Sequence, residues 1–266
     1  MQNSKLQFKI QKLKNIYHLL QAIIVNFIYG FPSRKIKVIG VTGTDGKTTT
    51  VHLIYHILKT AGKKVSMIST VHAKVAEKEY YTGFHITTPS SFFIQRSLKQ
   101  AVNHGDDFFI LETTSHGIDQ NRVWGIRYEI AVITNITHEH LDYHQTFEHY
   151  VLTKMKLLKM AKISLVNKDD ESFKQTQKLK IPALPAGRKI QNYSSKFKIL
   201  NKLPLLTKFN QYNYSAGYAV CRLLGISDEI ILKGMKSFKL PSGRLEIVYN
   251  KDFTVIIDFA DRKSVV

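Results

Sequence analysis

The fold is decided by residues 40–50, which read GVTGTDGKTTT. This stretch joins two predicted elements and overlaps both of them. Residues 37–41 are apolar and typical of a buried strand, and residues 48–60 are typical of a helix. Glycines in such a loop let backbone N–H groups turn toward phosphate oxygens, and the helix N-terminus adds positive potential. The strict Walker spacing would place a glycine at Val41, so this is a variant of it. The stretch predicts a phosphate-binding loop.

The rest of the chain alternates strands and helices in the same way. Further strands are predicted at residues 65–69, 108–112, 130–134 and 163–166, and further helices at residues 91–103 and 147–161. This order predicts an α/β fold of the P-loop type, with a mostly parallel sheet flanked by helices. Ligands of such sheets bind beyond the carboxyl ends of the strands. The motifs described below all lie at these strand ends or just after them.

Composition narrows the class of protein. The chain has 266 residues and is 44% hydrophobic, enough for one large core and a small appendage. A single cysteine, Cys221, excludes an internal disulfide, and no cleavable leader opens the sequence, so we expect a cytoplasmic protein. The net charge of +19 would suit an anionic partner, but the lysines are spread along the chain without a nucleic-acid motif. We expect no nucleic-acid partner, and a monomer.

Residues 1–35 differ from the rest. An apolar run at residues 16–31 follows four lysines, and it is too short and too interrupted to span a bilayer. One interpretation is a basic amphipathic helix that makes peripheral contact with a membrane or a partner. The favoured interpretation is a helix packed on its own domain.

Three segments carry residues suited to nucleotide and metal chemistry. In the loop, Lys47 can reach the outer phosphates and Thr48 can offer its hydroxyl to Mg²⁺. The LETTSH segment at residues 111–116 puts Glu112 at a strand end. The TNITHEHLDYH segment at residues 134–144 holds three histidines and two acids, which could form a metal site. A zinc hydrolase is an alternative, because its metal ligands can follow the pattern H-x-H-x-D-H. Here Tyr143 separates Asp142 from His144, so the spacing differs from that pattern by one residue.

These segments resemble those of Mur ligases. The TGTDGKT loop at residues 42–48 is shared with folylpolyglutamate synthases, while residues 111–116 and 134–144 are most similar to the UDP-N-acetylmuramoyl-tripeptide synthetases. The resemblance covers about residues 36–260. It implies domains at 1–35 (N-terminal basic amphipathic helical segment), 36–245 (ATP-binding Mur ligase central domain) and 246–266 (start of the C-terminal ligase domain). Most of the N-terminal domain and the rest of the C-terminal domain are expected to be missing.

The resemblance also implies roles for individual residues. The nucleotide would be held by Gly43, Thr44, Asp45, Gly46, Lys47, Thr48, Thr49, Asn210, Asn213, Arg244 and Asp258. The metal ligands would be Thr48, Glu112, His140 and Lys154, the last as a carbamate, while His138 and His144 would be structural. The muramoyl-peptide substrate would be contacted by Thr87, Thr88, Thr114, Gln120 and Arg122, and the departure at Ile86 affects one substrate contact. Lys47, Lys154 and Arg244 would be the catalytic group.

The implied activity is ATP-dependent amide-bond formation in peptidoglycan synthesis. With ATP and Mg²⁺, an amino acid would be joined to a UDP-muramoyl-peptide-like precursor through an acyl phosphate. The identity of the amino acid does not follow from these motifs. The alternative is a non-catalytic, ATP-binding relative that acts as a partner subunit, and we expect this chain to bind ATP without completing the amide bond alone.

Overall fold

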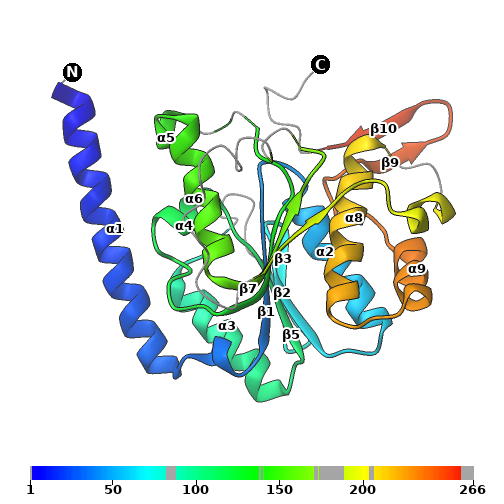
Figure 1. Cartoon of the computed structure of the whole chain (residues 1–266), viewed down its shortest axis with the longest axis horizontal. Helices are drawn as coiled ribbons and strands as arrows, with labels where there is room; N and C mark the ends of the chain where they lie inside the picture. The colour runs from blue at the N-terminus through cyan, green and yellow to red at the C-terminus, as the bar shows by residue number, and fades with distance from the viewer. Residues whose placement is uncertain are drawn as a thin grey trace.

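The computed structural model describes residues 2–81, 88–137, 139, 141–170, 173, 189–203 and 207–258. Its centre is an eight-stranded sheet with the order β4-β3-β2-β5-β1-β6-β7-β8 (Figure 1). The strands are β1 (Lys37–Thr42), β2 (Val65–Ile68), β3 (His72–Val75), β4 (Lys78–Tyr81), β5 (Phe108–Glu112), β6 (Tyr128–Ile133), β7 (Ala161–Asn167) and β8 (Lys189–Tyr193). The strands β2, β5, β1, β6, β7 and β8 are neighbours in this order and pair in parallel. Strands β3 and β4 extend the sheet beside β2 through antiparallel pairs.

Helices cover both faces of the sheet (Figure 1). One face carries α2 (Lys47–Thr60), α8 (Lys208–Leu223) and α9 (Asp228–Ser237), whose apolar side chains form one core cluster with the sheet. The other face carries α3 (Ser91–His104) and α6 (Phe147–Lys159), which contribute to a second cluster. The described part of the chain also contains the short helices α4 (Ser115–Asp119), α5 (Leu141–His144), η1 (Pro32–Arg34) and η2 (Lys198–Lys202).

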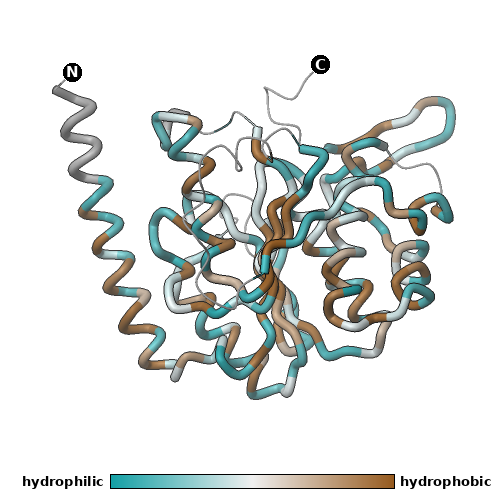
Figure 2. The backbone as a smooth tube through the Cα atoms, viewed as in Figure 1, coloured by the Kyte–Doolittle hydropathy of each residue, from teal (hydrophilic) through white to brown (hydrophobic). Residues whose placement is uncertain are grey.

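Strand β1 shows why the sheet is buried on both sides. Ile39 and Val41 face the cluster with α2, whereas Val38 faces the opposite cluster, and all three are fully buried. A central parallel strand covered on both faces needs apolar residues at successive positions. Figure 2 shows this as hydrophobic colouring along the middle strands.

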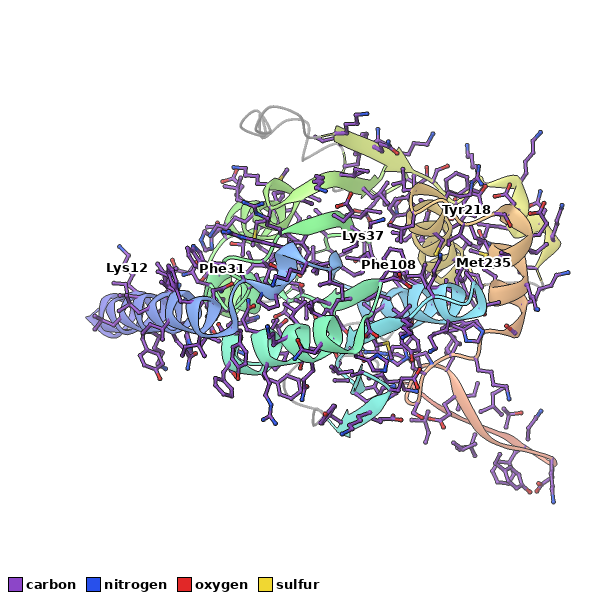
Figure 3. All side chains as sticks on the ribbon, turned by 90° about the horizontal axis from the view of Figure 1, so that it is seen from below. Lys12, Phe31, Lys37, Phe108, Tyr218 and Met235 are labelled. Atoms are coloured by element: carbon purple, nitrogen blue, oxygen red, sulfur yellow. The ribbon has the colours of Figure 1, made fainter. Side chains whose placement is uncertain are left out.

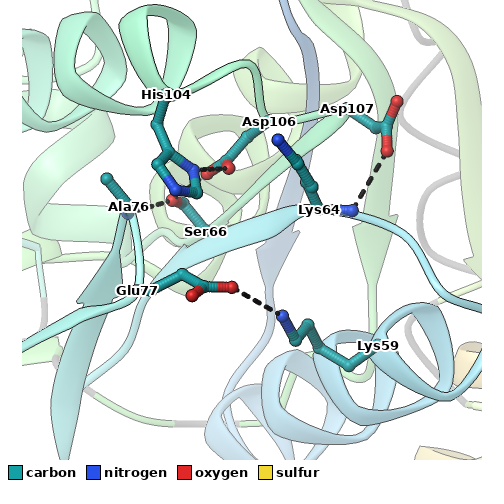
Figure 4. A network of polar contacts seen from close by, with 8 residues as sticks. All are labelled: Lys59, Lys64, Ser66, Ala76, Glu77, His104, Asp106 and Asp107. Carbon is teal, nitrogen blue, oxygen red and sulfur yellow. Dashed lines mark hydrogen bonds and ion pairs between the residues drawn. The ribbon is translucent and has the colours of Figure 1, made fainter.

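A polar network at the opposite end from the loop aligns β2 with β5 (Figure 4). The hydroxyl of Ser66 on β2 donates to the carboxylate of Asp106, which also pairs with His104 at 2.7 Å. The backbone N–H of Lys64 donates to the carboxylate of Asp107 at 3.0 Å. These bonds support the register in which Ile68 lies opposite Leu111. That register brings the residues after β2 beside Glu112.

The predicted elements are present, with corrections at their ends. The helix expected at residues 147–161 ends at Lys159, because Ala161 pairs with Tyr128 as the start of β7. The apolar run Met160-Ala161 continues the helical pattern, so sequence periodicity did not reveal this boundary. The strands β3 and β4 at one side of the sheet, the edge strand β8 and the helices α4, α8 and α9 were not predicted; α8 and α9 pack on α2 in the same core cluster.

Two elements lie at the periphery. Helix α1 (Gln2–Tyr29) runs along one side of the molecule and packs against α3, and a hairpin of β9 (Glu246–Asn250) and β10 (Thr254–Ile257) forms a separate two-stranded sheet (Figure 1). Among the described residues, no helix is long and apolar enough to cross a membrane. The domain limits predicted at residues 35 and 245 stay predictions.

Candidate functional site

A pocket of about 580 Å³ opens at the carboxyl ends of the strands. It brings together residues from the loop after β1, from β5, from α8 and from the segment that leads into the β9–β10 hairpin. Its lining consists of Thr44, Asp45, Gly46, Lys47, Thr48, Thr49, Thr70, Glu112, Asn135, Phe209, Asn210, Tyr212, Asn213, Leu240, Arg244, Leu245 and Asp258. Most of the residues expected to bind a nucleotide therefore share one cavity.

Two glycines of the loop cannot be replaced without disturbing its neighbours. Gly46 has φ +76°, and a Cβ there would lie 2.0 Å from Oδ1 of Asn213. A Cβ on Gly43 would lie 1.8 Å from Oγ1 of Thr134. Gly46 is also the residue before α2, so the N-terminus of that helix faces the pocket. The loop has the tight backbone and the positive helix end that phosphate binding requires.

The side chain of Lys47 folds back over the loop. Its Nζ donates to the carbonyl oxygens of Gly43 at 3.1 Å and Thr44 at 2.6 Å. Both acceptors are neutral backbone groups, and the ammonium remains part of the pocket lining. A lysine held this way is available to a phosphate anion, which offers a stronger, charge-assisted bond.

Glu112 is a buried carboxylate held by three donors. Its Oε1 accepts from the hydroxyls of Thr48 at 3.1 Å and Thr70 at 2.9 Å, and its Oε2 accepts from the backbone N–H of Thr70 at 2.9 Å. Only 1% of Glu112 is exposed, and it makes no ion pair with any residue that the structure describes. A buried carboxylate beside a hydroxyl is an oxygen donor set suited to Mg²⁺.

Lys154, on α6, lies directly behind the loop. It is 1% exposed, and its Nζ donates to the carbonyl oxygen of Gly43 at 2.5 Å and lies 4.5 Å from the ring centroid of Tyr150. Burial, and then the charge of nearby Lys47, hold the pKa of Lys154 well below its usual range. Because the same carbonyl serves both lysines, the neutral form of Lys154 avoids a repulsion between two cations.

Three of the residues expected to contact the muramoyl-peptide substrate are hydrogen-bonded to one another. The hydroxyls of Thr88 and Thr114 lie 3.0 Å apart, and Thr88 also accepts from the backbone N–H of Thr114 at 2.8 Å. Nη1 of Arg122 donates to the carbonyl of Thr88 at 2.7 Å, and Nε2 of Gln120 donates to the hydroxyl of Tyr143 at 3.3 Å. Thr114 closely follows β5, and the hydroxyl of Thr88 donates to the carbonyl oxygen of Glu112 at 3.4 Å, so this group adjoins Glu112.

The expected adenine and ribose residues come from α8 and the hairpin segment. Asn213 donates from Nδ2 to Oδ1 of Asn210 at 3.2 Å, which ties the two amides together. The carboxylate of Asp258 accepts from the backbone N–H of Leu245 at 3.2 Å, next to Arg244 in the chain. Asn210, Asn213, Arg244 and Asp258 are far from the phosphate loop in the sequence. They nevertheless line the same pocket as the loop.

Some predicted residues are not accounted for. Thr87, His138 and His140 lie outside the described residues. His144 is described, is buried, and lies 3.4 Å from His149 through their Nδ1 atoms. Burial, and then nearby His116, lower the pKa of His144 to about 4. Within the described part of the chain, no three acidic, cysteine or histidine side chains gather as a metal site.

Sequence reasoning missed three residues that shape the pocket. Oδ1 of Asn135 accepts from the backbone N–H groups of Thr44 at 3.1 Å and Asp45 at 2.8 Å, and so holds the loop. The hydroxyl of Tyr150 lies 3.0 Å from Oγ1 of Thr44. Thr70 positions Glu112, as described above. Asn135 and Thr70 both follow predicted strands, and a polar residue at that location was the available signal.

Comparisons with known proteins identify the family of this chain. Residues 41–221, more than half of the chain, match the family described as the Mur ligase middle domain. The chain is 36% identical over 251 residues to the UDP-N-acetylmuramoyl-L-alanyl-D-glutamate--2,6-diaminopimelate ligase of Aquifex aeolicus, covering 87% of this chain and 52% of that relative. It is 34% identical over 268 residues to the ligase of the same name from Geobacillus thermodenitrificans, covering 90% and 54%. The chain thus spans about half the length of the curated relatives it matches.

Solved structures show the same fold. A structure of UDP-N-acetylmuramoyl-L-alanyl-D-glutamate--2,6-diaminopimelate ligase superposes with a TM-score of 0.70 at 25% identity, covering 85% of this chain and 51% of that one. Mycobacterium tuberculosis folylpolyglutamate synthase complexed with ADP superposes with a TM-score of 0.69 at 18% identity, covering 91% and 66%, which shows the fold alone. From the family match and the identity to its relatives, the chain belongs to the Mur ligase family, and residues 41–221 are its middle domain.

Proposed function

We propose that this chain is the ATP-binding part of a ligase that joins an amino acid to a UDP-muramoyl-peptide-like precursor. The observation that carries the proposal is the buried Glu112 carboxylate beside Thr48, in the same pocket as Lys47. The two relatives described above are named as ligases of 2,6-diaminopimelate, which agrees with this chemistry. The reaction belongs to peptidoglycan synthesis.

ATP would enter the pocket with its phosphates at the loop. Backbone N–H groups from Gly43 to Thr49 and the Nζ of Lys47 would bind the phosphate oxygens. Asn210, Asn213 and Asp258 line the same pocket, where the adenine and ribose would lie, and Arg244 would neutralise phosphate charge. The residues Thr48 and Glu112 fit Mg²⁺, because Glu112 is a buried anion without an ion-pair partner among the described residues. When bound, the metal would neutralise charge on the transferred phosphoryl group.

The reaction needs no nucleophile from the protein. A carboxylate of the precursor attacks the γ-phosphorus of ATP, the bond to the β-phosphate oxygen breaks, and an acyl phosphate and ADP form. The amine of the amino acid then attacks the acyl carbon, and phosphate and a proton leave as the amide forms. Lys47 and Arg244 would contribute by holding the phosphates and stabilising their charge. Thr88, Thr114, Gln120 and Arg122 would hold the precursor, with Thr87.

We infer that Lys154 is the site of carbamylation by CO₂. An amine reacts with CO₂ only when it is unprotonated, and burial beside Lys47 keeps the pKa of Lys154 well below its usual range. The reaction forms an N–C bond, releases a proton and turns a neutral group into an anion. The carbamate would join Thr48, Glu112 and His140 as a metal ligand, with CO₂ supplied by dissolved bicarbonate.

Calorimetric titration with Mg-ATP tests the nucleotide site. Lys47→Ala should weaken binding at least tenfold, because a charge-assisted hydrogen bond is worth about 1.5–3 kcal/mol. The matched control is Lys59→Ala on the same helix, whose exposed ammonium pairs with Glu77 instead of lining the pocket. Equal ATP affinity in both variants and the unchanged chain would contradict the assignment.

Two further measurements separate the parts of the proposal. Carbon-13 NMR with labelled bicarbonate should show a carbamate signal that Lys154→Met lacks, and an identical signal in both proteins would rule out carbamylation of Lys154.

Product analysis with a UDP-muramoyl dipeptide, ATP and either diaminopimelate or lysine tests ligation itself. Because we expect this chain to bind ATP without completing the amide bond alone, tripeptide formed by it at about 1 per second or faster would contradict that expectation and would exclude the non-catalytic alternative.

A further inference from the structure

Helix α1 exposes an apolar row along its outer face. Leu13, Tyr17, Leu20, Ile24 and Phe27 follow one another at alternating spacings of four and three residues. Between 54% and 68% of each side chain is exposed. At about 100° per residue, these positions lie on one narrow strip of a helix. Ile16 and Ile28, also more than half exposed, flank the row and widen it into a stripe.

The opposite face of α1 is committed to its own domain. Ala22 and Asn26 are fully buried, and Nδ2 of Asn26 donates to the carbonyl oxygen of Trp124 at 2.9 Å. Nearer the N-terminus, Nδ2 of Asn15 donates to the carboxylate of Asp119 at 3.1 Å. Rotating α1 to bury the stripe would break both of these bonds and expose the buried Ala22 and Asn26, so the helix keeps the stripe on its outer side.

The charges around the stripe select its partner. The sequence of α1 contains lysines at positions 5, 9, 12 and 14 and no aspartate or glutamate. Lys12 and Lys14 are exposed, and Figure 3 shows Lys12 on the helix at the edge of the molecule. A second copy would bring an equally basic helix against this one, in chains that each carry a net charge of +19. An apolar stripe with lysines and no acids matches an anionic lipid surface instead.

We propose that α1 binds the surface of an anionic lipid bilayer, with the stripe in the headgroup region and Lys12 and Lys14 at the lipid phosphates. The helix lies along the surface, because its opposite face stays packed on the domain through Ala22 and Asn26. Tyr17 and Phe27 are suited to this depth, because aromatic rings favour the boundary between headgroups and acyl chains. No α1 residue is among those that line the ATP pocket described above, so lipid binding leaves that pocket accessible.

Sedimentation with vesicles tests the proposal on the whole chain. Vesicles of phosphatidylcholine mixed with phosphatidylglycerol should bind the protein, and vesicles of phosphatidylcholine alone should bind it at least tenfold more weakly. Leu20→Glu with Ile24→Glu should reduce binding to the mixed vesicles at least tenfold, since glutamate keeps helix propensity while removing the stripe. Lys12→Gln and Lys14→Gln should each reduce it about fivefold.

The control is Ile247→Glu with Val248→Glu, two exposed apolar residues on the β9–β10 hairpin. This variant should bind mixed vesicles like the unchanged chain, and circular dichroism should show all variants folded. Equal loss in the control and stripe variants would overturn the proposal, as would equal binding of the unchanged chain to both vesicle types. Sedimentation equilibrium without lipid provides the other decisive result. A dimer that the stripe variant converts to monomer, together with no vesicle binding, would assign the stripe to self-association.

Discussion

Replacing Gly46 with alanine should destabilise the protein through two separable effects. The first is backbone strain, because Gly46 has φ +76°, a conformation that costs a residue with a side chain about 1–2 kcal/mol. The second is a collision, since the new Cβ would lie 2.0 Å from Oδ1 of Asn213. Asn213 is 4% exposed and would have to give up its bonds to Thr50 and Asn210, at about 1–3 kcal/mol.

The sum of the two effects predicts a loss of about 2–5 kcal/mol in the free energy of unfolding. Gly105→Ala is the matched control, because Gly105 has φ +77° and nothing within 4 Å of its added Cβ. It should show the strain alone, about 1–2 kcal/mol. Urea unfolding followed by circular dichroism, without nucleotide, measures both variants and keeps the result independent of ATP binding.

A double-mutant cycle then isolates the collision. Asn213→Ala removes the atoms that the new Cβ would meet, so the cost of Gly46→Ala in that background should fall to the value for Gly105→Ala. The reasoning is refuted if Gly46→Ala costs no more than Gly105→Ala, or if its cost is the same with and without the amide of Asn213.

Three further changes test the surroundings of the site. In bicarbonate-free buffer, Lys154→Met should raise stability near neutral pH, and this gain should shrink as the pH approaches 10.5. The reason is that the pKa of Lys154 is lowered in the folded state, so between that lowered pKa and 10.5 only the unfolded lysine binds a proton. A gain in stability that is independent of pH in urea titrations would contradict this. Thr70→Val should cost about 1.5–3 kcal/mol, because the carboxylate of Glu112 loses a hydroxyl donor at 2.9 Å, and unchanged stability by thermal unfolding would count against that bond. The pKa of His144 is lowered from 6.5 to about 4, so between these pH values the unfolded state binds a proton that the folded state does not. The free energy of unfolding should therefore decrease by on the order of 3 kcal/mol as the pH is lowered from 6.5 to 4. His144→Phe should remove this part of the acid sensitivity in unfolding curves measured at several pH values.

Much of the fold was predictable because its central units are local. The strand, loop and helix around residues 40–50 are contiguous, and their apolar periodicity and glycines describe the backbone directly. The outer strands β3 and β4 at one side of the sheet and β8 at the other are short and less apolar, so their pairing depends on the sheet beside them. The burial of Asn26 and the exposure of Phe27, which are neighbours on α1, likewise follow from where the domain lies and not from the residues themselves.

The family resemblance, the phosphate loop and the candidate residues could be recognised from the amino-acid sequence alone, since each motif is a short run whose chemistry does not depend on distant residues. The roles of His140 and Thr87 stay predictions, because both lie outside the described residues. Which side chains meet depends on how the whole chain folds. Glu112 is held by Thr70, forty-two residues away, and Lys154 reaches Gly43 across one hundred and eleven residues. Such contacts depend on the order and register of parallel strands, in which β1 lies between β5 and β6. Strand order arises from burying the whole sheet at once, and no short segment of the chain encodes it.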